Sequence, residues 1–330
     1  MNIKKFLIIL IYSIFIVSFY NCFLIKNKNS QNLNNLNYKK LMRDFVINIS
    51  KYAKGINPNF IIIPQNGQEI LTLDGTINSN PALEYISAID GIGREDFFYG
   101  YLNDDEETPE SDRLYILSFL NIAKNFNKVI IIIDYCSTHS KIDNSYYQNN
   151  NLGFISFAAN RRELDNIPKY PIKPYNENSN DINSLGDAKN FLYIINPSSY
   201  LNKNDFLNAL KNTNFDIIII DLFFYSETLT KEDIDSLKTK KNGGKRLIIC
   251  YMSIGEAEDY RYYWNQEWNN HPPSFLSAEN PNWPGNYKVK YWDQEWQAII
   301  YGNDDSYLKK IIDANFDGVY LDIIDAFEYF

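Results

Sequence analysis

The chain has 330 residues, enough for one large α/β domain of about 250–300 residues preceded by a leader. Its net charge is −9, and lysine and arginine occur only in short runs, which argues against nucleic acid as a partner. With two histidines, neither a multi-histidine zinc site nor a Ser-His-Asp triad is expected. We expect a monomer that needs no cofactor and no metal.

The first residues have the layout of an export signal. In residues 1–21, two lysines precede the apolar run Phe6–Phe19, and Cys22 follows directly. We expect cleavage before Cys22 and lipidation of its thiol, which would give a membrane-anchored lipoprotein at the cell surface or in the periplasm. The alternatives are an uncleaved anchor helix and simple secretion. Residues 22–37 have few large apolar side chains and are expected to form a flexible tether.

The folded part is expected to span residues 38–330. A helix is predicted first, at Tyr38–Tyr52, because apolar residues recur there at helical spacing, and Gly55 and Pro58 end it. Eight apolar runs then predict buried strands, namely Phe60–Ile63, Ala88–Ile92, Val129–Ile133, Gly153–Ala158, Phe191–Ile195, Asp216–Ile220, Arg246–Tyr251 and Gly318–Leu321. Further helices are predicted at Leu114–Phe126, Phe206–Leu210, Thr230–Lys240 and Tyr307–Ala314.

These elements predict the fold class. Continuous runs of valine and isoleucine are typical of strands buried on both faces, which favours a parallel sheet. Eight such strands, most of them followed by a helical pattern, predict a closed (β/α)8 TIM barrel. The order is unusual, because the chain begins with the helix Tyr38–Tyr52 and ends with the strand Gly318–Leu321. We therefore predict a circularly permuted barrel in which that helix packs beside the last strand.

Polar side chains gather where the predicted strands end, which is the face where barrel enzymes build their active sites. They are Gln65, Asn66, Glu95, Asp134, Asp221, Glu256 and Asp322, and Asp325 follows the last of them. Each alone is consistent with a helix cap or an ion-pair partner, but seven at equivalent places favour a shared site. Carboxylates that face one another in such a mouth can divide into an acid and a nucleophile or base.

All five tryptophans lie between Trp264 and Trp296, in the long connection after the strand that ends near Tyr251. A loop rich in tryptophan, tyrosine, asparagine and proline is typical of a platform that stacks on sugar rings. Trp283 and Trp292 are the candidates for such contacts. The alternative is a large loop stabilised by its own aromatic side chains.

Three segments resemble glycoside hydrolase family 114, the endo-α-1,4-polygalactosaminidase-related barrels. The segment Tyr251–Arg261, with the sequence YMSIGEAEDYR, resembles the strand-three motif of that family, and Asn280–Trp292 and Phe316–Phe330 continue the likeness. In the usual order of the family, the segments found here at 191–330 come first and those at 38–165 come last. The resemblance therefore implies the same permutation as the helix-first pattern.

The resemblance also implies a catalytic pair. The family's proposed nucleophile is the first Asp of an Asp-x-x-Asp motif in the fourth strand, and it matches Asp322 in the segment DIID. A Glu in the sixth strand, the proposed acid/base, matches Glu95 in the segment GRED. The polygalactosaminidase branch has Glu and Pro before its Asp, where this chain has Tyr320 and Leu321, and this departure concerns the substrate more than the chemistry.

The resemblance thus implies a retaining endo-glycosidase that acts on an α-linked amino-sugar polysaccharide, with Asp322 as nucleophile and Glu95 as acid/base. The other polar and aromatic candidates would orient this pair or bind the substrate, namely Asp221, Glu256, Asp134, Asp325, Tyr251, Arg261, Asn66, Trp283 and Trp292. A non-catalytic, carbohydrate-binding surface lipoprotein is the alternative, because the tether and the tryptophan-rich loop suit it equally well. A metal-dependent carboxylate enzyme is a third option, although no metal-ligand spacing stands out.

Overall fold

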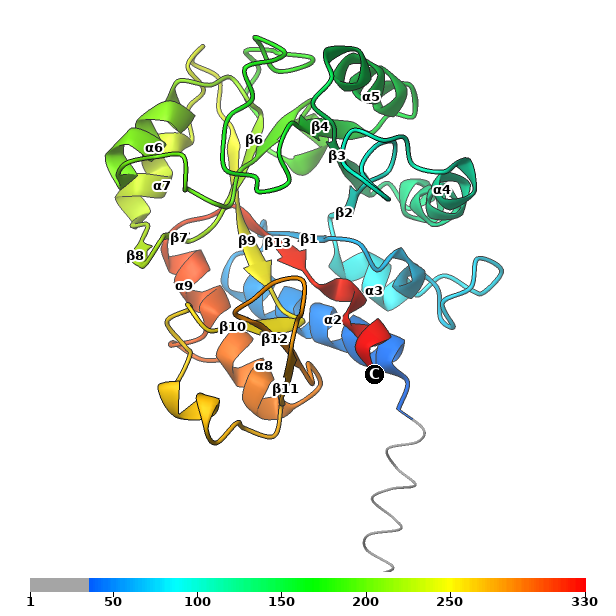
Figure 1. The fold of residues 1–330 in the computed structure, drawn as a ribbon, viewed down its shortest axis with the longest axis vertical. Helices are drawn as coiled ribbons and strands as arrows, with labels where there is room; N and C mark the ends of the chain where they lie inside the picture. The colour runs from blue at the N-terminus through cyan, green and yellow to red at the C-terminus, as the bar shows by residue number, and fades with distance from the viewer. Residues whose placement is uncertain (1–35) are drawn as a thin grey trace, which may run out of the picture.

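The computed structural model describes residues 36–330, and the leader with Cys22 lies outside them. Eight parallel strands converge at the centre of the molecule, with helices around them (Figure 1). The strands are β1 (Ile61–Pro64), β2 (Gly91–Glu95), β3 (Val129–Tyr135), β4 (Ile155–Ala159), β5 (Phe191–Tyr193), β6 (Ile217–Ile220), β9 (Leu247–Ser253) and β13 (Gly318–Asp322). Nearly all their residues are buried, as expected for apolar runs covered on both faces.

The eight strands form two parallel sheets that meet at β1 and β2. One sheet has the order β1-β13-β9-β6-β5 and the other the order β2-β3-β4. They are joined by a parallel bridge between Gln65 and Gly93 and by the Asn66 amide, which donates to the Gly93 carbonyl over 2.9 Å. The last strand of the chain, β13, therefore pairs with the first, β1, with Gly318 opposite Ile61.

The step from β4 to β5 is different. Within residues 36–330 no strand ladder joins these two strands, although the rings of Phe157 and Phe191 lie 5.8 Å apart between them. The α/β class and the parallel strand order are thus as predicted. Closure of the barrel and its circular permutation stay predictions.

The helices lie outside the strands, and most connect one strand to the next (Figure 1). They are α2 (Tyr38–Ile56), α3 (Leu83–Ala88), α4 (Glu110–Asn125), α5 (His139–Asn151), α6 (Lys203–Lys211), α7 (Lys231–Leu237), α8 (Gln294–Ile300) and α9 (Tyr307–Asp313). Short 3-10 turns follow several strands, including η1 (Gln68–Leu71), η2 (Leu185–Asp187), η3 (Gln266–Asn269) and η4 (Ile324–Tyr329). No helix among residues 36–330 combines the length and the apolar character needed to cross a membrane.

Helix α2 packs against η4, the turn that follows the last strand. The Asn37 side chain caps it by accepting from the Lys40 amide over 2.9 Å, and one apolar stripe that includes Phe45 and Ile49 is wholly buried. The Tyr38 ring lies 5.8 Å from the ring of Phe330, just after η4. The C-terminus accordingly lies beside α2 in Figure 1.

A smaller lobe follows β9. It contains an antiparallel sheet of β10 (Glu256–Glu258), β12 (Asn286–Val289) and β11 (Leu276–Glu279), with α8 beside it. A two-stranded hairpin, β7 (Phe223–Phe224) and β8 (Glu227–Thr228), follows β6. Neither the lobe sheet, the hairpin nor α5 is predicted from the sequence.

The strand predicted at Ala88–Ile92 is wrong in its bounds. Residue 88 ends α3, and β2 begins at Gly91 and runs on to Glu95. The reason is tertiary pairing: Gly91 to Glu95 lie opposite Val129 to Ile133 of β3, so the polar segment GRE continues the strand. Glu95 is therefore the last residue of the strand itself, and it does not lie on a following loop.

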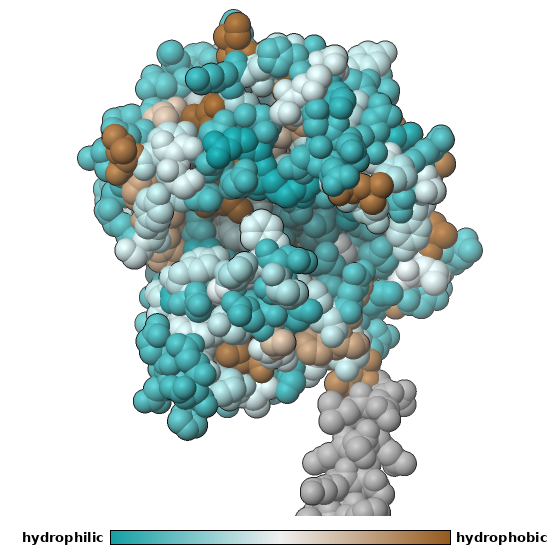
Figure 2. All heavy atoms as spheres, in the orientation of Figure 1, coloured by the Kyte–Doolittle hydropathy of each residue, from teal (hydrophilic) through white to brown (hydrophobic). Residues whose placement is uncertain are grey.

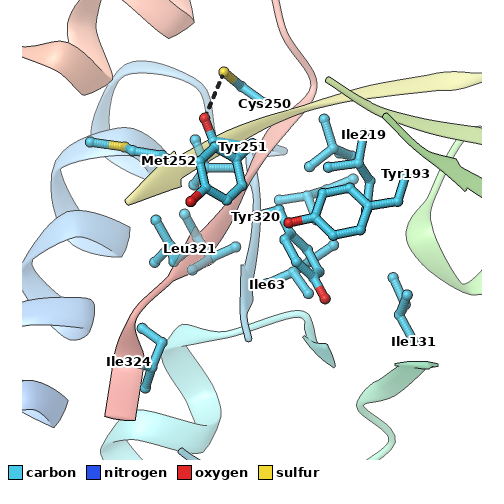
Figure 3. Close-up of a cluster of buried hydrophobic side chains, with 14 of the residues drawn as sticks. Ile63, Ile131, Tyr193, Ile219, Cys250, Tyr251, Met252, Tyr320, Leu321 and Ile324 are labelled. Carbon is cyan, nitrogen blue, oxygen red and sulfur yellow. Dashed lines mark hydrogen bonds between the residues drawn. The ribbon is translucent and has the colours of Figure 1, made fainter. Parts of the chain in front are cut away.

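Tyrosine rings fill the space between the strands below their carboxyl ends. Figure 3 shows Tyr193, Tyr251 and Tyr320 among aliphatic side chains such as Ile63 and Ile131. The rings of Tyr193 and Tyr320 lie 5.3 Å apart. This buried layer lies directly beneath the polar strand ends.

Gly93 gives Tyr320 its place in this layer. A Cβ atom on Gly93 would overlap the Tyr320 hydroxyl and ring. We therefore expect Gly93→Ala to displace the Tyr320 ring and to lower the free energy of unfolding by about 1–3 kcal/mol in urea melts. Gly55→Ala is the matched control, because no atom lies within 4 Å of a Cβ at that helical position. Equal stability of the Gly93 variant and the wild type would contradict this packing.

Candidate functional site

A cavity of about 640 Å³ opens at the carboxyl ends of the strands, a volume typical of ligand sites. Figure 2 shows a hollow near the centre of this face, with hydrophilic residues around it. Seven carboxylates line it, but only two guanidinium groups do so, Arg162 and Arg261. The carboxylates are Glu95, Glu163, Asp221, Glu256, Glu258, Asp322 and Asp325. The acidic surplus suits a neutral or cationic ligand.

Glu95 reaches the cavity from the end of β2. Its carboxylate accepts a hydrogen bond from the Asn66 amide group over 3.0 Å and a short one from the Tyr135 hydroxyl. The Asn66 Oδ1 atom in turn accepts from the Glu95 backbone amide over 3.1 Å. Asn66 follows β1 and Tyr135 ends β3, so both neighbouring strands hold Glu95 in position.

Asp322 reaches the same cavity from the end of β13. The Tyr251 hydroxyl of β9 donates to its Oδ2 over 2.7 Å, and the Ile323 amide donates to its Oδ1 over 2.8 Å. Burial, followed by the negative charge of Glu95, raises the pKa of Asp322 from its ordinary value of 3.8 to about 8. The two carboxyl groups thus interact electrostatically, with β1 lying between their strands.

The backbone turns sharply after three of these strands. Asn66, Asp96 and Ile323 have φ angles of 60°, 57° and 60°, in the left-handed region. For a β-branched residue such as Ile323 this conformation is a genuine outlier. Strain of this kind is found where a site fixes its geometry, and here it falls next to Asp322 and Glu95.

Asp325 continues the acidic wall. Burial is the main reason why its pKa rises to about 6, and the charges of Glu328 and Glu95 add to the shift. Its carboxylate lines the main cavity and also a second, smaller hollow lined by η1 and the start of α4. Asp325 therefore lies between the catalytic candidates and this side pocket.

Asp221 and Arg261 form a buried pair at the cavity wall. Arg261 donates to both Asp221 oxygens, over 2.8 and 2.7 Å, and also to Glu258. Such a bidentate pair fixes geometry. Because the Asp221 oxygens are occupied in this way, Asp221 and Arg261 position the lobe against the strand end of β6.

Glu256 is wholly buried and lies at the start of β10. Its Oε1 atom accepts from Asn280 over 2.9 Å and from the Tyr329 hydroxyl over 2.8 Å. Its Oε2 atom has no hydrogen-bond partner among residues 36–330. Glu256 also lines the cavity, so this unpartnered acceptor lies at the cavity wall.

Two of the expected substrate-binding residues do not belong to the cavity. Asp134 is fully buried, and its oxygens accept from the Phe98 and Tyr99 amides and from the side chains of Ser145 and Asn149. It thus ties the loop after β2 to α5. Trp292 packs with its ring 5.1 Å from Tyr38 and 4.9 Å from Phe330, which fixes the lobe against α2.

The predicted tryptophan platform is also largely absent from the cavity, because most of the tryptophans do not line it. Trp296 is fully buried and donates to the Ile254 carbonyl over 2.8 Å, and Trp264 is buried against Trp268. Only Trp283 is both exposed, at 56%, and part of the cavity lining. Most of the tryptophan-rich loop is therefore stabilised by its own aromatic side chains, and Trp283 remains the tryptophan that can contact a ligand in the cavity.

Several cavity residues are missed by the sequence interpretation, namely Tyr135, Arg162, Tyr193, Tyr225, Glu258 and Tyr260. The alternation of side chains along β3 indicates the face on which Tyr135 lies, because that face also carries Ile131 and Ile133. Arg162 lies over the Tyr135 ring, 3.8 Å from its centroid, and no local pattern reveals that contact. In residues 36–330 no group of three or more His, Cys, Asp and Glu side chains is arranged to hold a metal ion.

The chain is similar to one family model and to several uncharacterized proteins. Residues 173–329 match the model of glycoside-hydrolase family GH114. An uncharacterized protein of Methanocaldococcus jannaschii is 44% identical over 179 residues, which are 53% of this chain and 49% of that protein. Uncharacterized proteins of Thermotoga maritima and Deinococcus radiodurans are 40% and 38% identical, over 36% and 37% of both chains. The chain thus spans about half of the first relative and just over a third of the other two.

Proposed function

We propose that this protein hydrolyses glycosidic bonds with Asp322 and Glu95, because residues 173–329 match the model of glycoside-hydrolase family GH114. The observation that carries the proposal is the placement of these two carboxyl groups. They end β13 and β2, on either side of β1, and they line one acidic cavity. Each is oriented by a tyrosine hydroxyl from the next strand outward, Tyr251 for Asp322 and Tyr135 for Glu95.

The proposed reaction retains the anomeric configuration. Asp322 attacks the anomeric carbon and forms a glycosyl ester, while protonated Glu95 gives its proton to the departing glycosidic oxygen. Glu95 then takes a proton from water, and the oxygen of that water attacks the anomeric carbon and releases Asp322. This mechanism requires carboxyl groups about 5–5.5 Å apart, whereas inversion requires about 6.5–9.5 Å.

The proposed substrate is an α-linked polysaccharide with free amino groups, cleaved within the chain. The acidic surplus of the cavity lining supports a cationic substrate, and the unpartnered Glu256 oxygen offers an acceptor for an ammonium group. Tyr320 and Leu321, which precede Asp322, are the residues where this chain departs from the polygalactosaminidase branch. The sugar is therefore best identified by assay.

The test is a panel of purified polymers: α-1,4-galactosaminan, its fully N-acetylated form, chitosan and an uncharged α-glucan. We expect new reducing ends from galactosaminan, with oligosaccharides of several lengths appearing early, as internal cleavage produces. Proton NMR of the first product should show the α-anomer before mutarotation. Release of the β-anomer would contradict retention, and binding without cleavage of any polymer would favour the carbohydrate-binding alternative.

We also propose that the chain is exported and anchored through lipid at Cys22, on the leader pattern of residues 1–22. Cells that express the wild-type chain and are fed labelled palmitate should yield a labelled protein in the membrane fraction. Cys22→Ser should remove both the label and the membrane association. A wild-type chain that carries no label would contradict the anchor.

A further inference from the structure

Three exposed aromatic side chains lie at the rim of the cavity and have no role in the chemistry above. Tyr225, Tyr260 and Trp283 are 60%, 61% and 56% exposed, and all three line the cavity that holds Asp322 and Glu95. They come from three separate segments: the β7–β8 hairpin, the turn after β10 and the connection between β11 and β12. We propose that they form a stacking strip that binds sugar units beside the cleaved bond.

Tyr225 is held in place at a conformational cost. It lies in the two-residue turn between β7 and β8 with a φ angle of 53°, in the left-handed region. Hairpin turns of this length normally use Asn or Gly at such a position, and a bulky residue there is an outlier. A strained aromatic residue that is exposed at a cavity rim is consistent with selection for its ring.

Tyr260 and Trp283 are fixed by residues of the cavity wall. The Tyr260 hydroxyl donates to Glu258 over 2.7 Å, and the Arg261 guanidinium lies 5.3 Å from its ring centroid. The Trp283 amide donates to the Asn280 carbonyl over 3.1 Å, and Asn280 is itself bonded to Glu256. The Tyr260 ring and the Trp283 backbone therefore have a set position relative to the buried carboxylates.

The occupant follows from the chemistry of the rim and the cavity. An aromatic face carries partial negative charge, which attracts the C–H face of a pyranose ring and, more strongly, a protonated amine. The acidic cavity lining repels polyuronic acids and favours the same cationic or neutral sugars. The strip thus fits the non-reacting units of an amino-sugar polymer, an inference that rests on the proposed function.

The test is a steady-state comparison of Tyr225→Ala, Tyr260→Ala and Trp283→Ala on long galactosaminan. We expect each change to raise KM about three- to tenfold and to leave kcat within about twofold, because stacking acts equally on bound substrate and transition state. Tyr225→Phe, Tyr260→Phe and Trp283→Phe keep a ring and should restore most of the affinity. Tyr147→Ala is the control, since Tyr147 is 59% exposed on α5, away from the lining residues.

Unchanged KM in the three alanine variants, or phenylalanine variants as weak as the alanine ones, would overturn the strip. Gel retardation in the same polymer separates this inference from the proposed function. A wild type that binds galactosaminan without cleaving it would contradict the hydrolase, while loss of retardation in the alanine variants would still support the strip. A wild type retarded by no polymer of the panel would overturn both. Thermal melts of every variant should match the wild type, which excludes misfolding as the cause of weak binding.

Discussion

Asp322→Asn is expected to lower kcat on the cleaved polymer by about a thousandfold or more, because the nucleophilic oxygen loses its negative charge. The amide has the shape of the carboxyl group and can keep the contact with the Tyr251 hydroxyl, which now donates 2.7 Å to Oδ2. Substrate binding should therefore change little. Glu95→Gln is expected to have a similar effect on substrates with a poor leaving group, since it removes the proton donor.

Azide can separate the two roles. With Asp322→Ala, azide should enter the vacated space and produce a glycosyl azide of inverted configuration. With Glu95→Ala, azide should attack the glycosyl ester on Asp322 and give the retained configuration. Asp44→Asn is the matched control, because Asp44 pairs with Lys40 over 2.6 Å on the exposed side of α2 and is not part of the cavity lining. Wild-type turnover by Asp322→Asn would contradict the assignment.

The strand framework was predictable because its signal is strong and local. Runs such as Ile217–Ile220 are apolar throughout, and burial on both faces is the structure that suits them. By contrast, α5 has the sequence HSKIDNSYYQNNN, with only Ile142 and Tyr146 as large buried side chains, and its polar residues give no clear stripe. The lobe strands β11 and β12 are mostly half-exposed, so their alternation is weak as well.

The candidate site was predictable only in part, and Asp134 shows why. It ends an apolar run just as Asp322 does, so the linear sequence treats the two alike. Successive side chains of a strand point to opposite faces. Tyr135 therefore points to the cavity, as does Glu95 on β2, while Asp134 points outward to Ser145 on α5. The alternation of β3 distinguishes these positions, but the strand-end pattern does not.

Tyr135 and Tyr225 show two further limits. Tyr135 acts on Glu95 across 40 positions of sequence, through the β2–β3 ladder whose register places Glu95 opposite Ile133. Tyr225 lies in a turn that follows a strand of only two residues, too short for periodicity to reveal. The alternation of β3 indicates the face on which Tyr135 lies but not its contact with Glu95, and the sequence around Tyr225 does not indicate that it lines the cavity.

Asp322 is also expected to limit the stability of the protein at neutral and alkaline pH. Its pKa rises from 3.8 in the unfolded chain to about 8 in the folded protein, chiefly through burial and then through the charge of Glu95. Between these values the folded protein holds a proton that the unfolded chain has lost. The free energy of unfolding therefore falls as pH rises, by up to about 1.4 kcal/mol for each pH unit. The stabilising contribution is complete below pH 3.8 and is lost as the pH passes 8.

Asp322→Asn cannot ionise, so it should be more stable than the wild type by a margin that is small near pH 4 and grows to several kcal/mol at about pH 8. Urea melts of both proteins at pH 4, 6 and 8 measure that margin. Glu95→Gln removes the second cause of the raised pKa, so the decline in stability should persist but end at a lower pH. A margin that is constant over this range, or that shrinks with rising pH, would show that Asp322 is not held protonated by its surroundings. The proposed reaction therefore requires Asp322 to lose this proton before it attacks, and a cationic sugar in the cavity would favour that loss.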